Sequence, residues 1–432
     1  MGSVSASLAL MLIGLVTGVL AARGLGPEHR GLLGIIVFWI QLLANASRLP
    51  ISEAILVHAN QAEGCNRLAL AWGSYRVAQR VSLLLAFALF PLSSAVLYLI
   101  LELYSAPFLE ISLILLGLTL LSRTQNEGFL GLIYVLQDYR KVNTMRLVVP
   151  VVYLLGVIAA IQTDLAVTGF LLAHCVSMIA AYLYRLTQFP QKHSAIVDQR
   201  DCRDVIRRAF SLHGLSLTSI FTKQADKLVL YVASPATFIG QYIVAFTLLA
   251  PVQSVLNTAL TTIGFPVFAG SDADAMEEIA YRMLRMAVTA SLLLSLSISL
   301  VGPFVVTVLF GPEYHDAGQM IRYLAVATVL MPIRTAAAQL LKATGDVRTP
   351  LHSEFVYGLA FLAAFFPAHG ESVLMGAVAG FGLGNLASLA VLVVALCRRW
   401  PGLVGLGWAL PGPAAFRDIL AIVIHRRKKQ KL

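Results

Sequence analysis

The sequence predicts an all-α polytopic membrane protein with about twelve transmembrane helices, arranged as two six-helix bundles around a central cavity. Of its 432 residues, 58% are apolar and only 12% are charged, whereas soluble domains are roughly half apolar and about a quarter charged. The apolar residues form long continuous runs, as membrane helices of about 20 residues require. Connecting segments rich in Lys and Arg alternate along the chain with segments that have almost none. These observations exclude a soluble or disordered chain and an outer-membrane barrel of short alternating strands.

Twelve apolar runs, separated by polar breaks, are the predicted spans. The fifth run is short for a membrane span, and the second is long and interrupted by Pro50. The runs cover residues 4–22, 32–57, 81–101, 110–136, 147–161, 166–186, 211–233, 238–266, 284–310, 317–341, 351–367 and 373–397.

The basic residues predict the orientation of these spans. Of the 32 Lys and Arg residues, 24 fall in every second connection with its adjoining span ends or in the C-terminal tail, two in the opposite connections, and six further inside spans. Cytoplasmic loops of membrane proteins carry such an excess of Lys and Arg. Both termini are therefore expected in the cytoplasm, and an even number of spans follows.

Landmarks that recur at one offset predict an internal repeat. A proline followed by a glycine after the first span, within 27–31, recurs after the seventh, within 235–240. An Asp-x-Arg sequence at 138–140 recurs at 346–348, 208 residues later. Coincidence of loop chemistry is the alternative. Two six-helix halves of equal topology would be related by an axis along the membrane normal. The expected domains are an N-terminal bundle with a cytoplasmic linker (1–200), a C-terminal bundle (201–400) and a basic cytoplasmic tail (401–432).

Cations inside the spans point to the kind of substrate. A charge at mid-bilayer costs roughly 2.5–3.5 kcal/mol on insertion scales, so these residues should face a wet cavity or pair with acids. Away from the span ends, six cations stand against four acids, which favours an anionic substrate, and Arg suits phosphate through its bidentate fork. The candidates for binding a pyrophosphate are Arg48, Arg123, Lys223, Lys227 and Arg334.

Some of these charges have a structural alternative. Glu127 follows Arg123 by four residues, and Asp226 lies beside Lys223 and Lys227, so both groups have the spacing of ion pairs on one helix face. Arg334 has no acid within one turn. Polar stripes on two spans are candidates for contacting sugar hydroxyls, with hydrogen bonding in the core as the alternative. They contain Gln41 and Asn45, and Gln253 and Asn257.

Neither a metal site nor a cofactor is expected. The four cysteines are scattered without pair spacing, and no His, Asp and Glu residues have ligand spacing. If transport is driven by an ion, Asp226 and Glu127 are the candidates to bind it, and whether the ion is H⁺ or Na⁺ stays open.

Several segments resemble one family over the length of the chain. They are similar to the conserved stretches of bacterial polysaccharide flippases, the O-antigen and exopolysaccharide repeat-unit translocases of the multidrug/oligosaccharidyl-lipid/polysaccharide exporter superfamily. These segments are Ala-Arg-Gly-Leu-Gly-Pro-Glu-His-Arg-Gly at 22–31, Asp-Lys-Leu-Val-Leu at 226–230, Gly-Gln-Tyr-Ile-Val-Ala at 240–245, 309–325 (which begins Leu-Phe-Gly-Pro-Glu-Tyr), and Leu-Leu-Lys-Ala-Thr-Gly-Asp at 340–346. His29 and Arg30 depart from the family, where small or aromatic residues usually precede the glycine.

The resemblance implies a multi-pass protein of the bacterial cytoplasmic (inner) membrane that is not an enzyme. It would flip lipid-pyrophosphate-linked oligosaccharide repeat units outward by alternating access, for polysaccharide export. The implied partners are an undecaprenyl-pyrophosphate-type glycolipid, membrane lipids and other polysaccharide-assembly membrane proteins, and no nucleic acid.

Two other functions are weighed against this one. A cation-coupled multidrug exporter of the same superfamily would need an acidic or aromatic cavity, which the excess of cations disfavours. A membrane glycosyltransferase or polymerase of the same pathway would need a catalytic loop, and the predicted outer loops are short.

Overall fold

The computed structural model describes residues 3–61, 66–163, 165–188, 199–259, 273–346, 348–367, 373–405 and 407–409. Within these ranges the ordered elements are helices and no strand is present, so the all-α prediction is confirmed. Seven helical segments there are long and apolar enough to cross a membrane, and Ala236–Pro251 is a shorter apolar one. Each of the twelve predicted spans overlaps a helix.

The chain folds into two compact units. Unit 1 comprises Met1–Phe221 and Pro235–Ile243, and unit 2 comprises Thr222–Ser234 and Val244–Leu432. Unit 1 contains α1 (Ser3–Ala46), α2 (Ile51–Gln61), α3 (Asn66–Leu103), α4 (Leu109–Val135), α5 (Tyr139–Ile161), α6 (Ala166–Thr187) and most of α7 (Gln199–Lys223). Unit 2 contains α8 (Ala225–Ala233), most of α9 (Ala236–Ala259), α11 (Ala273–Phe310), α12 (His315–Ala327), α13 (Leu330–Ala343), α14 (Arg348–Phe365) and α15 (Val373–Arg399), with 3₁₀ turns at Pro312–Tyr314, Pro401–Leu403 and Gly407–Ala409.

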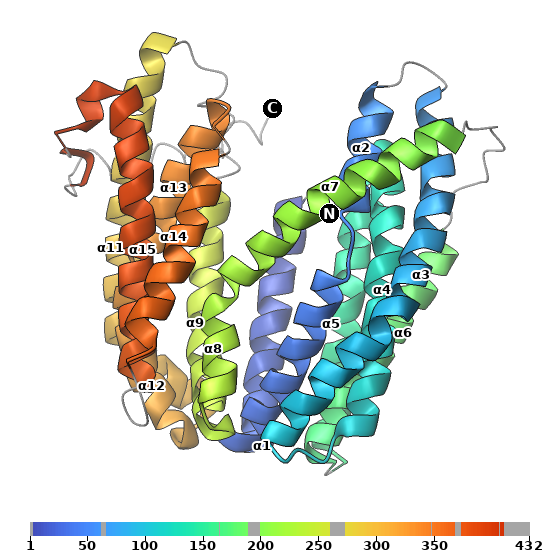
Figure 1. The fold of residues 1–432 in the computed structure, drawn as a ribbon. Coiled ribbons are helices and arrows are strands. Elements are labelled where there is room, and N and C mark those ends of the chain that lie inside the picture. The colour runs from blue at the N-terminus through green and yellow to red at the C-terminus, as the bar shows by residue number, and fades with distance from the viewer. Residues whose placement is uncertain are drawn as a thin grey trace. The chain divides into compact units, whose positions relative to one another are not determined.

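The first helix supplies two predicted spans. Gly26 has φ 68° and ψ 172°, outside the helical range, and at this residue the chain folds back on itself (Figure 1). Glycine adopts a positive φ without steric cost, and Pro27 directly after it suits the first turn of a new helix. The expected interruption at Pro50 is also present, because α1 ends at Ala46 and α2 begins at Ile51.

Helix α4 is the central helix of unit 1, in contact with α1, α2, α3, α5 and α6. Its middle carries five consecutive polar residues, 123–127, that an isolated membrane helix would not tolerate. Apolar cores pack against it toward both ends, one around Leu116 and Phe170 and the other around Phe129 and Tyr75. The polar run is therefore enclosed by neighbouring helices of the same unit.

The outer surfaces of the units are apolar. Large side chains such as Phe87 on α3 and Phe304 on α11 are about 70% exposed. These helices belong to different halves, and an exposed apolar face of this kind suits contact with lipid. The observation agrees with a chain that crosses the membrane several times.

In unit 2, one predicted span is divided into two helices. Helix α12 ends at Ala327 and α13 begins at Leu330, so Thr328 and Val329 interrupt the predicted tenth span. Pro332 in the first turn of α13 has no amide hydrogen to donate, which favours a helix break just before it. The core of unit 2 brings together α11, α13 and α15 around residues such as Leu284, Leu340 and Leu392.

The fifth span is longer than the apolar run predicted. Helix α5 begins at Tyr139, eight residues before the run at 147–161. Asp138 caps it by accepting a hydrogen bond from the backbone N–H of Lys141 at 3.2 Å. The first turns carry the basic residues Arg140, Lys141 and Arg146, so hydropathy places the start too late.

The sequence repeat at 138 and 346 corresponds to a repeated turn. Gln137 (φ 57°) and Gly345 (φ 85°) are both left-handed. The next amide, of Asp138 or Asp346, donates to a carbonyl five residues earlier at 3.2 or 3.0 Å, which is the Schellman helix ending. Asp346 then accepts hydrogen bonds from the Thr349 hydroxyl at 2.6 Å and the Thr349 amide at 3.0 Å, and these lower its pKa.

The other repeated landmark is a close crossing of two helices inside unit 1. A Cβ atom at Gly31 on α1 would overlap the carbonyl oxygen of Ala236 on α9, and one at Gly240 would overlap that of Pro27. The two hypothetical Cβ atoms would also lie 3.0 and 3.1 Å from the opposite glycine nitrogens. The contact is thus reciprocal, and the two backbones approach as closely as glycine allows.

We predict that Gly31→Ala and Gly240→Ala each destabilise the protein by at least about 2 kcal/mol, because backbone cannot move aside as a flexible side chain does. Thermal unfolding of the purified protein in detergent measures this. Gly358→Ala is the matched control, since its Cβ would meet nothing within 4 Å. Equal unfolding temperatures for all three variants would contradict the close crossing.

A second prediction concerns the repeated turn. Gln137→Gly should stabilise the protein by about 1 kcal/mol, because a non-glycine residue is strained in the left-handed region. Gly345→Ala should lower the free energy of unfolding by a similar amount. The added Cβ has open space around it, so only the backbone strain remains. The same unfolding measurement tests both, and effects of equal sign would refute the shared geometry.

Candidate functional site

The predicted polar residues of unit 1 form one group. Arg48 lies in the break between α1 and α2, and its Nη1 pairs with Oε1 of Glu127 on α4. Ser52, in the first turn of α2, donates a hydrogen bond to Oε2 of Glu127 at 2.7 Å. The Glu127 side chain is 5% exposed and that of Arg48 is 34% exposed. We name the following set the N cluster: Gln41, Asn45, Arg48, Ser52, Arg123 and Glu127.

Arg123 is the cation of the N cluster without a direct acid partner. Its Nη1 donates to Oδ1 of Asn45 and its Nη2 to Oε1 of Gln41, both at 3.0 Å. Amide oxygens satisfy the guanidinium protons but leave the positive charge in place. Because its two terminal nitrogens are held by residues one turn apart on α1, the guanidinium is fixed in orientation and stays half-buried.

The expected pairing along α4 is replaced by pairing between helices. Spacing on one face favoured an Arg123–Glu127 pair, but the structure joins Glu127 to Arg48, 79 residues away. The stripe through Gln41 and Asn45 on α1 faces Arg123, so these amides are occupied by protein. Sequence spacing predicted which residues share a face, and the packing of α1 and α2 on α4 decided the partners.

Unit 2 holds a second group on α8, α13 and α14. Nη1 of Arg334 lies 3.6 Å from Oε2 of Glu354, and the Arg334 guanidinium carbon lies 4.6 Å from the centre of the Tyr357 ring. Asp226 on α8 is 5% exposed and within electrostatic range of Tyr357. The acid near Arg334 is therefore on another helix. These four residues form the C cluster.

The two lysines predicted beside Asp226 are placed differently. Lys227 is half-buried, and its Nζ donates to Oε1 of Gln224 at 3.0 Å. The side chain of Lys223 lies outside the described part of the structure. Between these residues the helix is interrupted at Gln224, since α7 ends at Lys223 and α8 begins at Ala225.

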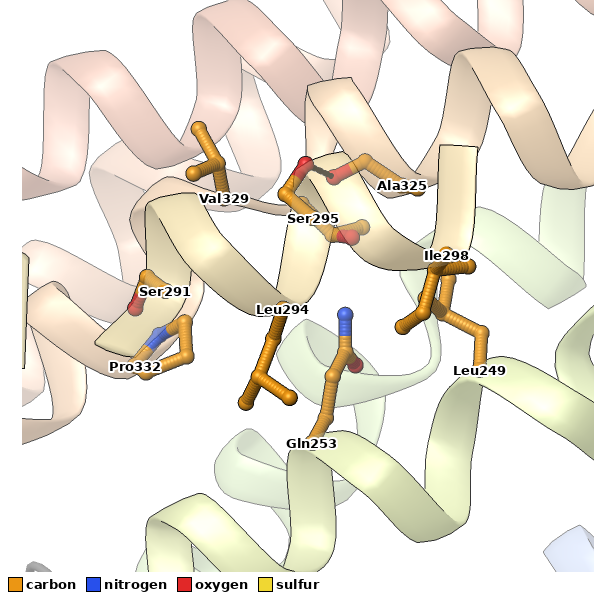
Figure 2. Close-up of a pocket in the computed structure, with 10 residues that line it drawn as sticks. Leu249, Gln253, Ser291, Leu294, Ser295, Ile298, Ala325, Val329 and Pro332 are labelled. Atoms are coloured by element: carbon orange, nitrogen blue, oxygen red, sulfur yellow. Dashed lines mark hydrogen bonds between the residues drawn. The ribbon is translucent and has the colours of Figure 1, made fainter. Parts of the chain in front are cut away.

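Gln253 lines a small cavity in unit 2 whose walls are mostly apolar, with a few polar side chains among them (Figure 2). The cavity of about 20 Å³ lies among α9, α11 and the α12–α13 break. Ser291 is buried and its hydroxyl has no hydrogen-bond partner within the described ranges, whereas the Ser295 hydroxyl donates to the Ala325 carbonyl at 2.6 Å. This space suits a water molecule and is too small for a sugar. Asn257 lies one turn after Gln253 on α9.

Two further polar groups of unit 1 were not predicted as sites. Arg185 on α6 is only 2% exposed, and its Nη1 lies 3.3 Å from both the carbonyl and the side-chain oxygen of Gln125. The sequence places it at the end of a span, where a cytoplasmic location is the simpler interpretation. Arg30 lies near the stacked rings of Tyr153 and His174. Gln125 in the polar run was the available signal for the first group.

Among the described residues, no group of three or more His, Cys, Asp and Glu side chains is arranged to hold a metal ion. The polar chemistry of both clusters consists of guanidinium, carboxylate, amide and phenol groups. Such groups bind and orient charged molecules, and the cations of the N cluster favour an anion.

The comparisons with known proteins agree with this architecture. A family model described as polysaccharide biosynthesis protein matches residues 3–271. No curated protein sequence matches the chain.

Solved structures share the fold at low identity. The lipid II flippase MurJ, in an inward closed conformation, has a TM-score of 0.72 at 12% identity, covering 97% of this chain and 92% of MurJ. An inward-facing multidrug resistance MATE family transporter of the MOP superfamily has 0.71 at 16%, covering 90% and 94%. A MOP superfamily transporter from Pyrococcus furiosus, described as having reversed polarity of its binding pocket, has 0.59 at 16%, covering 91% and 95%.

We predict that Glu127→Gln lowers the free energy of unfolding by about 1–2 kcal/mol, because Arg48 loses its charged partner while part of it stays in solvent. Chemical unfolding of the purified protein in detergent measures the change. Glu110→Gln is the control, since Glu110 is an exposed residue in the first turn of the same helix and should change little. A double variant with Arg48→Gln should lose less than the sum of the single losses, and strict additivity would refute the pair.

Proposed function

Because the chain belongs to the polysaccharide biosynthesis protein family, we propose that it flips a lipid-linked oligosaccharide across the bacterial inner membrane. The cargo is a repeat unit on an undecaprenyl-pyrophosphate-type lipid, moved from the cytoplasmic to the outer leaflet by alternating access. Similarity to a lipid II flippase and to MATE transporters supports a transport protein of this fold. The substrate itself is argued from the chemistry of the N cluster.

The observation that carries the proposal is the environment of Arg123. Its charge is held in mid-span by two amide oxygens, so the cation is fixed without being neutralised. Desolvating a charge in a membrane is costly, and an anionic substrate group would supply the missing countercharge. A pyrophosphate offers several oxygens to a planar guanidinium, which suits bidentate hydrogen bonding.

Arg48 is the second cation that we assign to the pyrophosphate in unit 1. Its side chain is partly exposed while its carboxylate partner is buried, so Glu127 orients Arg48 from the protein side and leaves its outer nitrogens accessible. Arg334, Lys227 and Lys223 are assigned the same role in unit 2. Gln41 and Asn45 act first by holding Arg123, and with Gln253 and Asn257 they remain the candidates for sugar contacts.

For ion coupling we propose Asp226 before Glu127. Asp226 is buried in the C cluster, where a second carboxylate, Glu354, flanks the same tyrosine. Acidic side chains inside a membrane bundle commonly mark proton and ion pathways. Glu127 is the second candidate, buried in the N cluster, where Arg48 and Ser52 contact its carboxylate.

The C cluster also favours a second candidate function, a cation-coupled multidrug exporter. Its two carboxylates and the Tyr357 ring are the kind of groups that bind organic cations. An exporter of this kind would raise drug resistance and would not need Arg123. The two candidate functions therefore differ in whether transport requires the cations of the N cluster.

We predict that Arg123→Gln reduces export of the oligosaccharide at least about tenfold, since a charge-assisted hydrogen bond is worth roughly 1.5–3 kcal/mol. The gene is deleted in its native bacterium and replaced by each variant. Lipid-linked oligosaccharide is then extracted, and the leaflet that holds it is determined. The deletion should accumulate complete repeat units facing the cytoplasm.

Arg322→Gln is the matched control, because Arg322 is an exposed arginine on α12. It should restore export as the wild type does, at equal protein level by immunoblot. Normal export with Arg123→Gln would refute the role of the N cluster. Unchanged export in the deletion strain, together with lost drug resistance, would favour the exporter.

A further inference from the structure

The polar stripe on the second half of α1 extends further than the N cluster. Arg30 precedes Gln41 and Asn45 on one face of α1, at the helical positions 30, 34, 37, 41 and 45, and Arg48 follows in the break after the helix. Every residue of this stripe is half-buried. At about 1.5 Å per residue, Arg30 lies roughly 16 Å from Gln41 along the helix axis, toward the Gly26 turn.

Arg30 has no ion-pair partner among the described residues. Its Nε is buried and makes no hydrogen bond to any residue that the structure describes, although the side chain as a whole is half-buried and reachable. A guanidinium of this kind, in the connection between the first two predicted spans and close to the Gly26 turn, is incompletely satisfied by the protein. An anion with several oxygens would supply the acceptors that the protein does not.

Two aromatic side chains lie within electrostatic range of Arg30, on the helices α5 and α6 that contact α1. Tyr153 on α5 and His174 on α6 stack with their ring centres 4.0 Å apart and 22° between the planes. Both rings are half-buried and lie within electrostatic range of Arg30. The phenol and the imidazole are hydrogen-bonding groups that recognise phosphate oxygens as readily as they recognise water. His174 is also within range of Arg123, which links this place to the N cluster.

The crossing of α1 and α9 lies at the same level. Gly31 follows Arg30 directly, and a Cβ at Gly34 would overlap the end of the Ile243 side chain. The stripe thus has an apolar interval at Gly34 and Val37, with cationic groups on either side. An anion moving along α1 would meet a cationic group before this interval and another after it.

We propose that Arg30, Tyr153 and His174 form an outer station, a second site for a phosphate-bearing group. The inference rests on the proposed function and adds a second binding place to it. The N cluster would hold the pyrophosphate first, and the outer station would receive it beyond the apolar interval. A path with two sites of moderate affinity lets an anion enter and leave, whereas a single strong site would retain it.

The test measures binding in a background that lacks the inner site. The variant Arg48→Gln/Arg123→Gln is purified in detergent, and inorganic pyrophosphate is titrated while the unfolding temperature is followed. Stabilisation should persist, with weaker affinity than in the wild type. Adding Arg30→Gln should weaken the residual binding at least about tenfold. Adding Arg23→Gln, an exposed arginine on the same helix, should not change it.

The outcomes distinguish a failure of the outer station from a failure of the pyrophosphate role of the N cluster. Residual binding that ignores Arg30→Gln, or no residual binding in a folded background variant, would overturn the outer station. Wild-type affinity in the background variant would instead overturn the pyrophosphate role of the N cluster. If the background variant does not fold, single variants of the otherwise intact protein replace it. Arg30→Lys should then retain more export than Arg30→Gln at equal protein level, and equal export would count against the station.

The choice of probe shows whether the phosphate group belongs to the transported lipid or to a membrane phospholipid. The same titrations are repeated in mixed micelles with undecaprenyl pyrophosphate, with phosphatidylglycerol, and with neutral undecaprenol. A substrate station should respond to undecaprenyl pyrophosphate through Arg30 and ignore undecaprenol. An Arg30-dependent response to phosphatidylglycerol alone would assign the site to a membrane lipid and overturn its place on the transport path.

Discussion

A guanidinium in the middle of a membrane bundle has to find its hydrogen-bond acceptors inside the protein, and Arg123 depends on α1 for them. Gln41 and Asn45 supply two oxygens from consecutive turns, which fixes α4 against α1. The neighbouring Glu127 then contacts Arg48 in the α1–α2 break and Ser52 in the first turn of α2. The polar run of α4 thereby determines which helices surround it, and the apolar cores pack at its two ends.

Much of the fold could be predicted from the sequence, because lipid constrains composition strongly. Apolar runs and the distribution of basic residues placed the spans, and Pro50 marked a real break. The start of α5 at Tyr139 was missed because its first turns are basic. The division at Thr328 was missed because apolar residues continue through it. Hydropathy registers residues that contact lipid, whereas caps and breaks depend on individual backbone groups.

The candidate site was predictable residue by residue but not pair by pair. Polar stripes at helical spacing identified Gln41, Asn45 and Arg48, and charge in mid-span identified Arg123. Their partners depend on packing between helices far apart in sequence, so spacing suggested Glu127 for Arg123 when its structural partner is Arg48. Arg334 looked isolated for the same reason, although Glu354 lies on the neighbouring helix α14. The two clusters also differ in composition, with two arginines and one carboxylate in the N cluster and one arginine and two carboxylates in the C cluster.

The reciprocal glycine contact between α1 and α9 constrains how the gene can diverge. Gly31 and Gly240 each exclude a side chain because of backbone in the other helix, so a change at one position cannot be compensated by a smaller residue at the other. The two sequence repeats can diverge in their polar clusters and helix lengths, whereas Gly31 and Gly240 both have to remain glycine. Natural variants should therefore show the two glycines as an inseparable signature, useful for aligning one half on the other when the rest has lost its similarity.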